Sequence, residues 1–286
     1  MMTGKPCFVT IFAAFLIASA SPAPAQEGPT AWTARTDWEK AHLILSVESS
    51  VPRSGANLPA ADLAADRRIA RELPAIFAEA SRPVLVDSRH TVGDRAEKDP
   101  ALGADILQAA EAGLKGLPVN SRDLRKVVVD YTYPLREVLG PLFVRHLLPR
   151  KTPPQPGWRP TKEYTGLVIY AKGPLPVHGE DAPARLRPCL FPEIFDDGME
   201  PVMLTGMGNP DFLKKWGGAA YTAALDEGPW RDRIGGEPFR IIATKLFGRY
   251  PTDPVIPRED AESFLASPSA GRIIPEGRVL LICHLE

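Results

Sequence analysis

The chain has 286 residues, of which 44% are hydrophobic and 24% charged, with a formal net charge of −1. This composition is typical of a globular protein long enough to bury two cores. The basic residues are scattered rather than striped, which argues against a nucleic-acid-binding face, and no charge run suggests an acidic tail.

The amino terminus predicts export. Lys5 precedes an apolar run over residues 8–18, and the sequence Ala-Pro-Ala at 23–25 follows. This order is typical of a signal peptide, here residues 1–25, cleaved after Ala25. The apolar run is about half the length of the ~20 residues that a membrane-spanning helix needs. Cys7 precedes the run, so it is not placed as a lipid acceptor. We expect a periplasmic or secreted protein with no transmembrane segment in the mature chain.

Proline content predicts where the chain divides. The segment 149–160 holds five prolines and is expected to be an extended linker. It separates an N-terminal domain at 26–148 from a C-terminal domain at 161–286. Strand and helix patterns are mixed in both, so the predicted fold class is α+β, with a small sheet covered by helices in each domain.

In the first domain, the segment "KAHLILSVES" predicts a strand because Leu43, Leu45 and Val47 alternate with less apolar residues. A helix is expected over 60–80, kinked or split at Pro74, and its predicted buried face holds Leu63, Ala70, Leu73, Phe77 and Ala80. The next segment, "RPVLVDSRHTV" at 82–92, predicts a second strand.

Two signals complete this domain. Asp99 and Pro100 form a capping residue and a first-turn proline, and they predict a helix with Leu102 and Ile106 on its buried face. The alternation in "LRKVVVDYTYPL" predicts a half-exposed antiparallel strand. A short helix over 135–148 is expected to close the domain.

The second domain opens with an interior strand at 167–171, which is apolar on both faces. Asp197 and Gly198 predict a hairpin turn. A capped helix is expected from Asn209 to Gly228, and a short acidic-start helix in "PREDAESFLAS". Two further strands are expected in "EPFRIIATKLFG" and "EGRVLLICHL".

No motif identifies a catalytic, cofactor-binding or metal-binding residue. The glycine spacing around Lys172 and Gly173 does not match a phosphate-binding loop, so we expect a turn after a strand there. Cys189 and Cys283 allow either a disulfide or, as the favoured interpretation, two buried thiols. The five histidines have no metal-ligand spacing; they are His42, His90, His146, His178 and His284.

Several segments resemble a known family. "TGLVIYAKG", "RPCLFPEIFDDGMEPV", "RIGGEPFRIIATKLFG" and "EGRVLLI" are similar, in this order, to a domain of bacterial exported proteins related to flagellar assembly protein T and the Helicobacter-type outer-membrane lipoproteins. "ADRRIARELPAIF" and "VVVDYTYPL" resemble the amino-terminal part of that group. The resemblance implies residence in the cell envelope and a flagellar or surface-assembly setting. It implies no catalytic residue.

These observations predict a non-catalytic scaffold or assembly factor that binds another envelope protein, through an unpaired strand edge. A periplasmic hydrolase with an unrecognised site is the first alternative. The second is a solute- or peptidoglycan-binding protein, which a deep pocket between the domains would favour.

Overall fold

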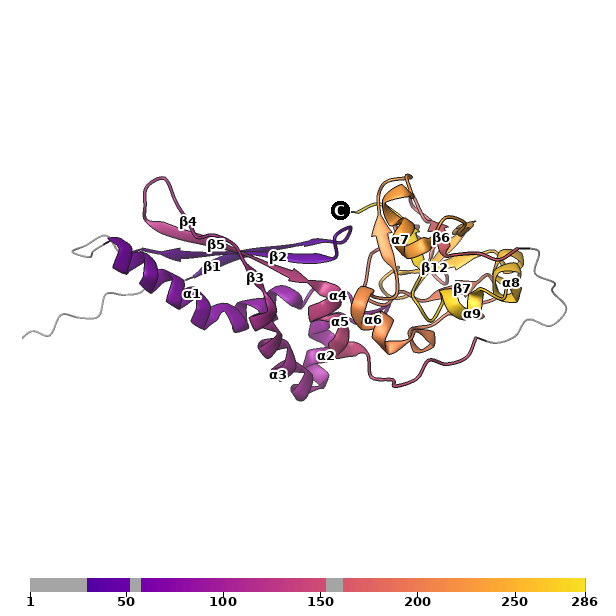
Figure 1. The fold of residues 1–286 in the computed structure, drawn as a ribbon, viewed down its shortest axis with the longest axis horizontal. Helices are drawn as coiled ribbons and strands as arrows, with labels where there is room; N and C mark the ends of the chain where they lie inside the picture. Colours follow the sequence, from indigo (N-terminus) through magenta and orange to yellow (C-terminus); the bar gives the residue numbers. More distant parts are fainter. Residues whose placement is uncertain (1–29, 52–57, 153–161, 286) are drawn as a thin grey trace, which may run out of the picture.

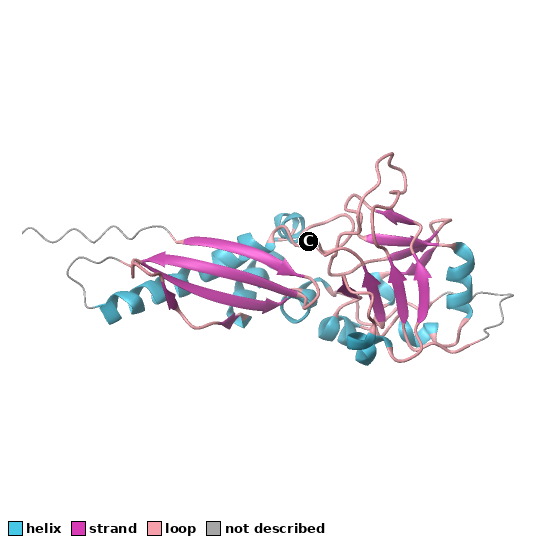
Figure 2. Cartoon of the chain, turned by 90° about the horizontal axis from the view of Figure 1, so that it is seen from above, coloured by secondary structure: helices cyan, strands magenta, loops and turns pink. Residues whose placement is uncertain are grey.

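The computed structural model describes residues 30–51, 58–152 and 162–285. The predicted signal peptide and most of the predicted linker lie outside these residues. Two regions of mixed helix and strand lie side by side, and the strands of the two regions form separate groups (Figures 1 and 2). The α+β fold class is therefore confirmed. No helix in the described part of the chain is both long and apolar enough to cross a bilayer.

The first region is an antiparallel sheet with helices on one face. Its central strands β2 (His42–Ser50) and β5 (Lys126–Pro134) pair along their whole length. Every second residue of both strands is buried, as the alternation predicted. Three shorter strands complete the sheet: β1 (Ala31–Asp37) on β2, and β3 (Leu114–Lys115) and β4 (Val119–Asn120) on β5.

Helix α1 (Leu58–Ser81) lies along this sheet (Figure 1). It is one continuous helix of 24 residues with Pro74 inside it, so the chain is not split there, and the alternative of a kink at Pro74 stays a prediction. Ile69, Ile76 and Phe77 are buried in the core under the sheet, and this packing offsets the backbone hydrogen bond that proline cannot make.

Shorter helices surround the end of the first sheet. The Asp99 carboxylate caps α3 (Pro100–Ala109) by accepting a bond from the Leu102 amide, as predicted. The segment 135–148 holds two short helices rather than one. With α3, the short helices at this end of the sheet are α2 (Val92–Lys98), η1 (Ala110–Ala112), α4 (Leu135–Val138) and α5 (Gly140–Phe143).

The second region contains two four-stranded sheets. The first is parallel throughout, in the order β10 (Phe239–Ile242), β6 (Leu167–Tyr170), β13 (Val279–Ile282) and β9 (Ala220–Thr222). The second has the order β11 (Lys245–Phe247), β12 (Asp253–Ile256), β7 (Ile194–Asp196) and β8 (Pro201–Met203). Strand β6 is interior and buried, and β7 and β8 form the hairpin expected at Asp197 and Gly198.

One helix of this region is shorter than predicted. Helix α6 (Pro210–Trp216) ends at Gly217, whose φ of 73° is outside the helical range, and residues 220–222 form β9 instead. The acidic-start helix is confirmed as α8 (Arg258–Ala266). The remaining short helices are η2 (Thr205–Met207), η3 (Gly228–Trp230), α7 (Arg231–Ile234) and α9 (Ala270–Ile273).

Candidate functional site at the domain junction

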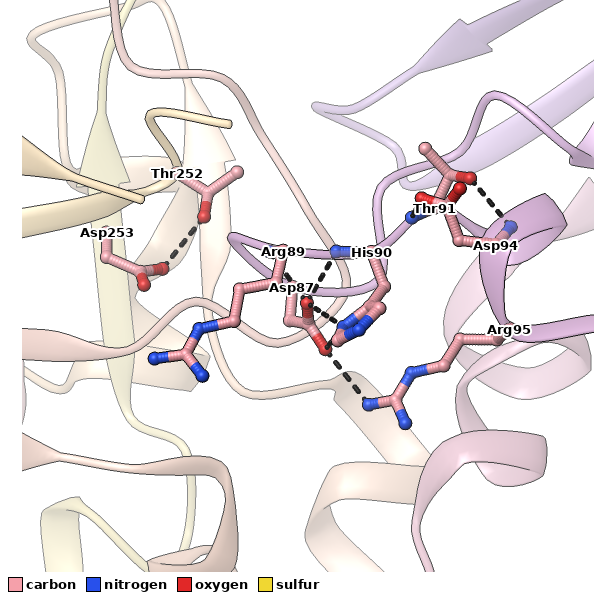
Figure 3. Close-up of polar contacts among 8 residues, drawn as sticks. All are labelled: Asp87, Arg89, His90, Thr91, Asp94, Arg95, Thr252 and Asp253. Atoms are coloured by element: carbon pink, nitrogen blue, oxygen red, sulfur yellow. Dashed lines mark hydrogen bonds and ion pairs between the residues drawn. The ribbon is translucent and has the colours of Figure 1, made fainter. Parts of the chain in front are cut away.

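A tight turn between α1 and α2 carries several polar side chains, and its backbone is bonded to the second region (Figure 3). We call residues 85–91 the junction loop. The two ends of the loop pair through an isolated β-bridge. Asp87 Oδ1 accepts hydrogen bonds from the amides of Arg89 and His90, both at 2.8 Å. These bonds fold the chain back on itself, so the strand predicted at 82–92 is wrong.

Asp87 also holds two basic side chains beside the loop (Figure 3). His90 Nδ1 lies 3.0 Å from Asp87 Oδ1, and a guanidinium nitrogen of Arg95 donates to Asp87 Oδ2 at 3.1 Å. Burial acts to raise the pKa of Asp87, but hydrogen bonds from the Arg89 amide, His90 and Arg95 outweigh it and lower that pKa. The carboxylate is therefore ionised at neutral pH.

Arg95 is positioned by the start of helix α2. Thr91 Oγ1 accepts a hydrogen bond from the Asp94 amide at 3.0 Å, and Asp94 Oδ2 accepts one from the Thr91 amide at 2.8 Å. This reciprocal pair is a capping box, and the Thr91 amide bond is the main cause of the lowered pKa of Asp94. The loop and the helix are thus fixed to one another by their own side chains.

Three backbone hydrogen bonds join the junction loop to the second region. The amides of Leu190 and Phe191 donate to the carbonyl oxygens of Leu85 and Val86, both at 2.9 Å. The Tyr250 amide donates to the Ser88 carbonyl oxygen, also at 2.9 Å. Main-chain bonds of this kind fix the two backbones in register, whatever the side chains.

Apolar packing reinforces these bonds. Leu190, Phe191 and Leu213 belong to the second region, yet they are buried in the hydrophobic core of the first. The ring of Trp38, from the turn after β1, packs edge-on against Tyr221 with ring centroids 5.8 Å apart. The two regions therefore share part of a hydrophobic core and are not independent domains joined only by a linker.

A buried carboxyl group lies behind the junction loop. Asp253, the first residue of β12, is 0% exposed. Its Oδ1 accepts a hydrogen bond from Thr252 Oγ1 at 2.8 Å (Figure 3). The Glu193 amide donates a second one to the same oxygen at 3.1 Å. Its Oδ2 has no hydrogen-bond partner. Burial raises the pKa of Asp253 to about 7, although hydrogen bonds from Ser88, Glu193 and Thr252 favour the ionised form.

Glu193 adds a second carboxyl group with a raised pKa, again caused first by burial. Its Oε1 accepts a hydrogen bond from the Thr205 amide at 3.2 Å. Ser88 is only 5% exposed, and the Asp253 carboxyl that its hydroxyl contacts is itself buried, so a nucleophile at this position would be closed to a substrate. Within the described residues, no group of three or more His, Cys, Asp or Glu side chains is placed to hold a metal ion. The geometry suits a structural clamp between the regions.

A different feature lies at the edge of the parallel sheet. Among the strands that the structure describes, β10 pairs with β6 alone. The amides of Phe239 and Ala243 donate to carbonyl oxygens at the β6 side, so the N–H and C=O groups of Arg240 and Ile242 face away from the sheet. Ile242 is 70% exposed. An open hollow of about 470 Å³ lies beside this edge, lined by Tyr170, Lys172, Leu175 and residues 240–243.

Comparison with known proteins was made on the sequence. Residues 29–141 match the family model of the N-terminal domain of Treponema pallidum Tp0624, and residues 166–285 match the model of the second domain of the same protein. The chain belongs to the Tp0624 family. A search of curated proteins gives no match. No link to flagellar assembly protein T or to the Helicobacter lipoproteins is found, so the Tp0624 family takes the place of the resemblance expected from the sequence.

The histidines of this Tp0624-family chain lie apart from one another. His90 is bonded to Asp87, His146 Nε2 lies 2.7 Å from the Gly208 carbonyl oxygen, and His178 packs near Phe247. Cys189 and Cys283 are both buried and both free, which agrees with the favoured interpretation of two buried thiols. Lys172 and Gly173 follow β6 as a turn in which Gly173 has a φ of 83°.

Asp87, Ser88 and Asp253 were not predicted as a cluster. The junction loop was taken for a strand, and Asp253 stands in a segment to which no element was assigned. One sequence signal points to the Asp253 carboxyl. Asp253 is followed by Pro-Val-Ile, an apolar run that is expected to be buried, and a buried carboxyl needs hydrogen-bond partners.

Proposed function

We propose that this Tp0624-family protein is a non-catalytic, exported binding protein, and that an extended segment of another envelope protein adds as a strand to the free edge of β10. The observation that carries the proposal is this edge, where the backbone groups of Arg240 and Ile242 meet no other strand of the described part of the chain. Strand addition satisfies such groups with main-chain hydrogen bonds.

The surroundings of the edge favour a peptide occupant. In an added strand, alternate side chains point to the same face of the sheet, and the side chain of Ile242 beside the hollow is 70% exposed and open to contact. Arg240 is tied to Glu227 by two hydrogen bonds, at 2.9 and 2.7 Å, so it stays clear of an approaching strand. A partner segment with apolar residues at alternate positions fits this chemistry.

The polar cluster at the junction gives no support to a hydrolase, because its buried carboxyl and hydroxyl groups serve the contact between the regions. The setting of the binding is periplasmic or extracellular in this proposal, from the predicted signal peptide. A flagellar or surface-assembly partner stays a prediction, because the comparisons show no link to the flagellar assembly group.

The test is site-specific photo-crosslinking in cells of the source organism. A crosslinking residue replaces Lys172, which lines the hollow. Three chains carry this crosslinker: one keeps Ile242, the second has Ile242→Pro and the third has Ile242→Thr. Proline removes only an N–H that faces away from β6, whereas threonine keeps it. We expect one defined adduct, reduced roughly fivefold by proline for one lost backbone bond and little changed by threonine.

A crosslinker in place of Leu117, which is 88% exposed in the first region, is the matched control and should give no adduct of this size. Equal adducts from both positions, or equal yields with proline and threonine, would refute strand addition. Turnover of any substrate in a hydrolase panel would refute the non-catalytic assignment.

A further inference from the structure

The Asp253 carboxyl group lies where three segments of the junction meet. Its side-chain hydrogen bond with Ser88 reaches the junction loop of the first region. The Glu193 amide donates to its Oδ1 at 3.1 Å, and Glu193 comes shortly after Phe191, whose own amide donates to the junction loop. The third segment is its own, from which Thr252 Oγ1 donates to the same oxygen at 2.8 Å. One carboxyl group therefore joins both contact segments of the second region to the loop of the first.

The surroundings of this carboxyl disfavour a negative charge. Asp253 is 0% exposed, and its Oδ2 is buried with no hydrogen-bond partner. Within the described residues, no lysine, arginine or histidine forms an ion pair with it. The neighbouring Cys189 thiol has a pKa raised well above its ordinary value, first by burial and then by the charge of Asp253. A buried charge with no cation beside it is costly, so the closed junction favours the protonated carboxyl.

The acidic groups around Asp253 belong to both regions. The Glu193 carboxyl has a raised pKa, caused first by burial, and its charge also acts to raise the pKa of Asp253. On the junction loop, Asp87 keeps a lowered pKa because His90 and Arg95 are bonded to it. The loop carboxylate is thus compensated within its own region, whereas the two carboxyls of the second region have no such cation.

The other cations near the junction are directed elsewhere. The charge of Arg89 acts to lower the pKa of Glu193, but it is outweighed by burial. The guanidinium groups of Arg187 and Arg249 lie over the ring of Tyr250, 5.5 and 5.3 Å from its centre. These contacts leave the ionised form of the buried carboxyl without a neutralising partner.

We propose that Asp253 makes the junction a pH-sensitive latch, which is closed while its carboxyl carries a proton and loosens when the carboxyl ionises and draws in water. Loosening separates the junction loop from the second region and uncovers Leu190 and Phe191, which are buried in the core of the first region when the latch is closed. The latch is independent of strand addition at the edge of β10.

The sign of the effect follows from the two states. The pKa of Asp253 is about 7 in the closed junction, and contact with water returns it toward its ordinary value of 3.8. The closed state therefore binds the proton more tightly, and acid favours it. Loosening increases as pH rises between these two values and becomes constant above about pH 7.

The test is hydrogen exchange of the full exported chain, measured by mass spectrometry between about pH 5 and 8. Peptides that contain Leu190, Phe191 and Tyr250 report the latch, because the amides of these residues donate across the junction. They should exchange faster than β2, since separation of the regions leaves the first sheet folded. Their opening constant, which is the observed rate divided by the intrinsic rate at each pH, should rise by up to about 10-fold per pH unit and level off above pH 7.

Two variants assign the effect to its residue. Asp253→Asn replaces the carboxyl with a neutral group of the same shape, so the opening constant should lose most of its pH dependence and keep only the shallower slope of Glu193. His90→Gln is the matched control, because it removes another titratable group of the junction and should keep the parent's slope. The parent's slope in Asp253→Asn, or loss of the slope in His90→Gln, would overturn the proposal.

Two results in the parent chain alone would also overturn it, even where a variant fails to fold. The first is an opening constant at the junction that does not change with pH. The second is exchange at the junction no faster than in β2, which would mean that the regions separate only by global unfolding.

Discussion

A Cβ atom built on Gly248 would lie 2.3 Å from the Cβ of Ser88, so the two regions approach one another here with no room for a side chain. Gly248 also has a φ of 109°, a conformation that residues with a side chain rarely adopt. The junction loop therefore depends on a glycine in the second region as much as on its own Asp87.

Gly248→Ala should lower the free energy of unfolding by about 3 kcal/mol, because it adds both backbone strain and a steric clash. Urea denaturation followed by circular dichroism measures this. Gly103→Ala is the control, since Gly103 lies in α3 and a Cβ there meets nothing within 4 Å. That change should raise the free energy of unfolding by up to about 1 kcal/mol. Equal stability of the two variants would contradict the close approach at Ser88.

The buried carboxyl of Asp253 should make stability depend on pH. Its pKa is about 7 in the folded protein against an ordinary value of 3.8, so the folded state binds the extra proton between these pH values. The free energy of unfolding should therefore fall as pH rises from about 4 to 7, by up to about 4 kcal/mol from this group. Above pH 7 the carboxyl is ionised in both states and its contribution is flat.

Asp253→Asn should remove most of this fall, and urea denaturation of both proteins between pH 4.5 and 8 measures the difference. Asp87 does not interfere, because its lowered pKa places its own titration below this range. Glu193, with a raised pKa, contributes a slope of the same sign and remains in the variant. Parallel pH profiles for the two proteins would show that Asp253 does not carry the titration.

Phe191→Ala should uncouple the regions. The side chain is buried in the core of the first region, and removal of a buried phenyl ring costs about 3–5 kcal/mol. The parent chain should unfold in one transition, and the variant should show two when each region carries its own fluorescent label. Leu117→Ala, at an exposed position, should leave the single transition unchanged. A single transition in Phe191→Ala would mean that the backbone bonds of the junction loop suffice.

The two thiols should be protected in the folded protein. Cys189 and Cys283 are buried and free, and burial raises the pKa of Cys283 to about 12. Iodoacetamide should label neither in the native mature chain and both after unfolding without reductant, which intact mass measures. Two unlabelled cysteines in the unfolded chain would indicate a disulfide.

Much of the fold follows from local sequence patterns. Alternation placed β2 and β5, and the pair Asp99-Pro100 placed the start of α3, because these signals depend on neighbouring residues alone. The buried face of α1 was predicted less well. Leu63 was expected in the core and is 50% exposed, while Ala61 and Ala65 are buried. Which side of a helix packs depends on the sheet below it, and small residues allow the closer approach.

The candidate site could not be predicted for a related reason. The apolar run of Val84, Leu85 and Val86 predicts a strand. The chain turns instead because the Asp87 carboxylate accepts hydrogen bonds from two backbone amides that follow it. Asp253 comes from a distant segment, and its raised pKa exists only because the second region buries it. A pattern of neighbouring residues does not indicate which distant segments of the chain come into contact.

The insertion of Leu190 and Phe191 into the first region has a consequence for biogenesis. A chain synthesised from its amino terminus presents residues 30–148 before these two side chains emerge. The first region must then remain with part of its apolar core uncovered near Val86, exposed to chaperones and proteases, until the second region arrives to cover it. A truncated product that stops before residue 190 should therefore be short-lived in the cell.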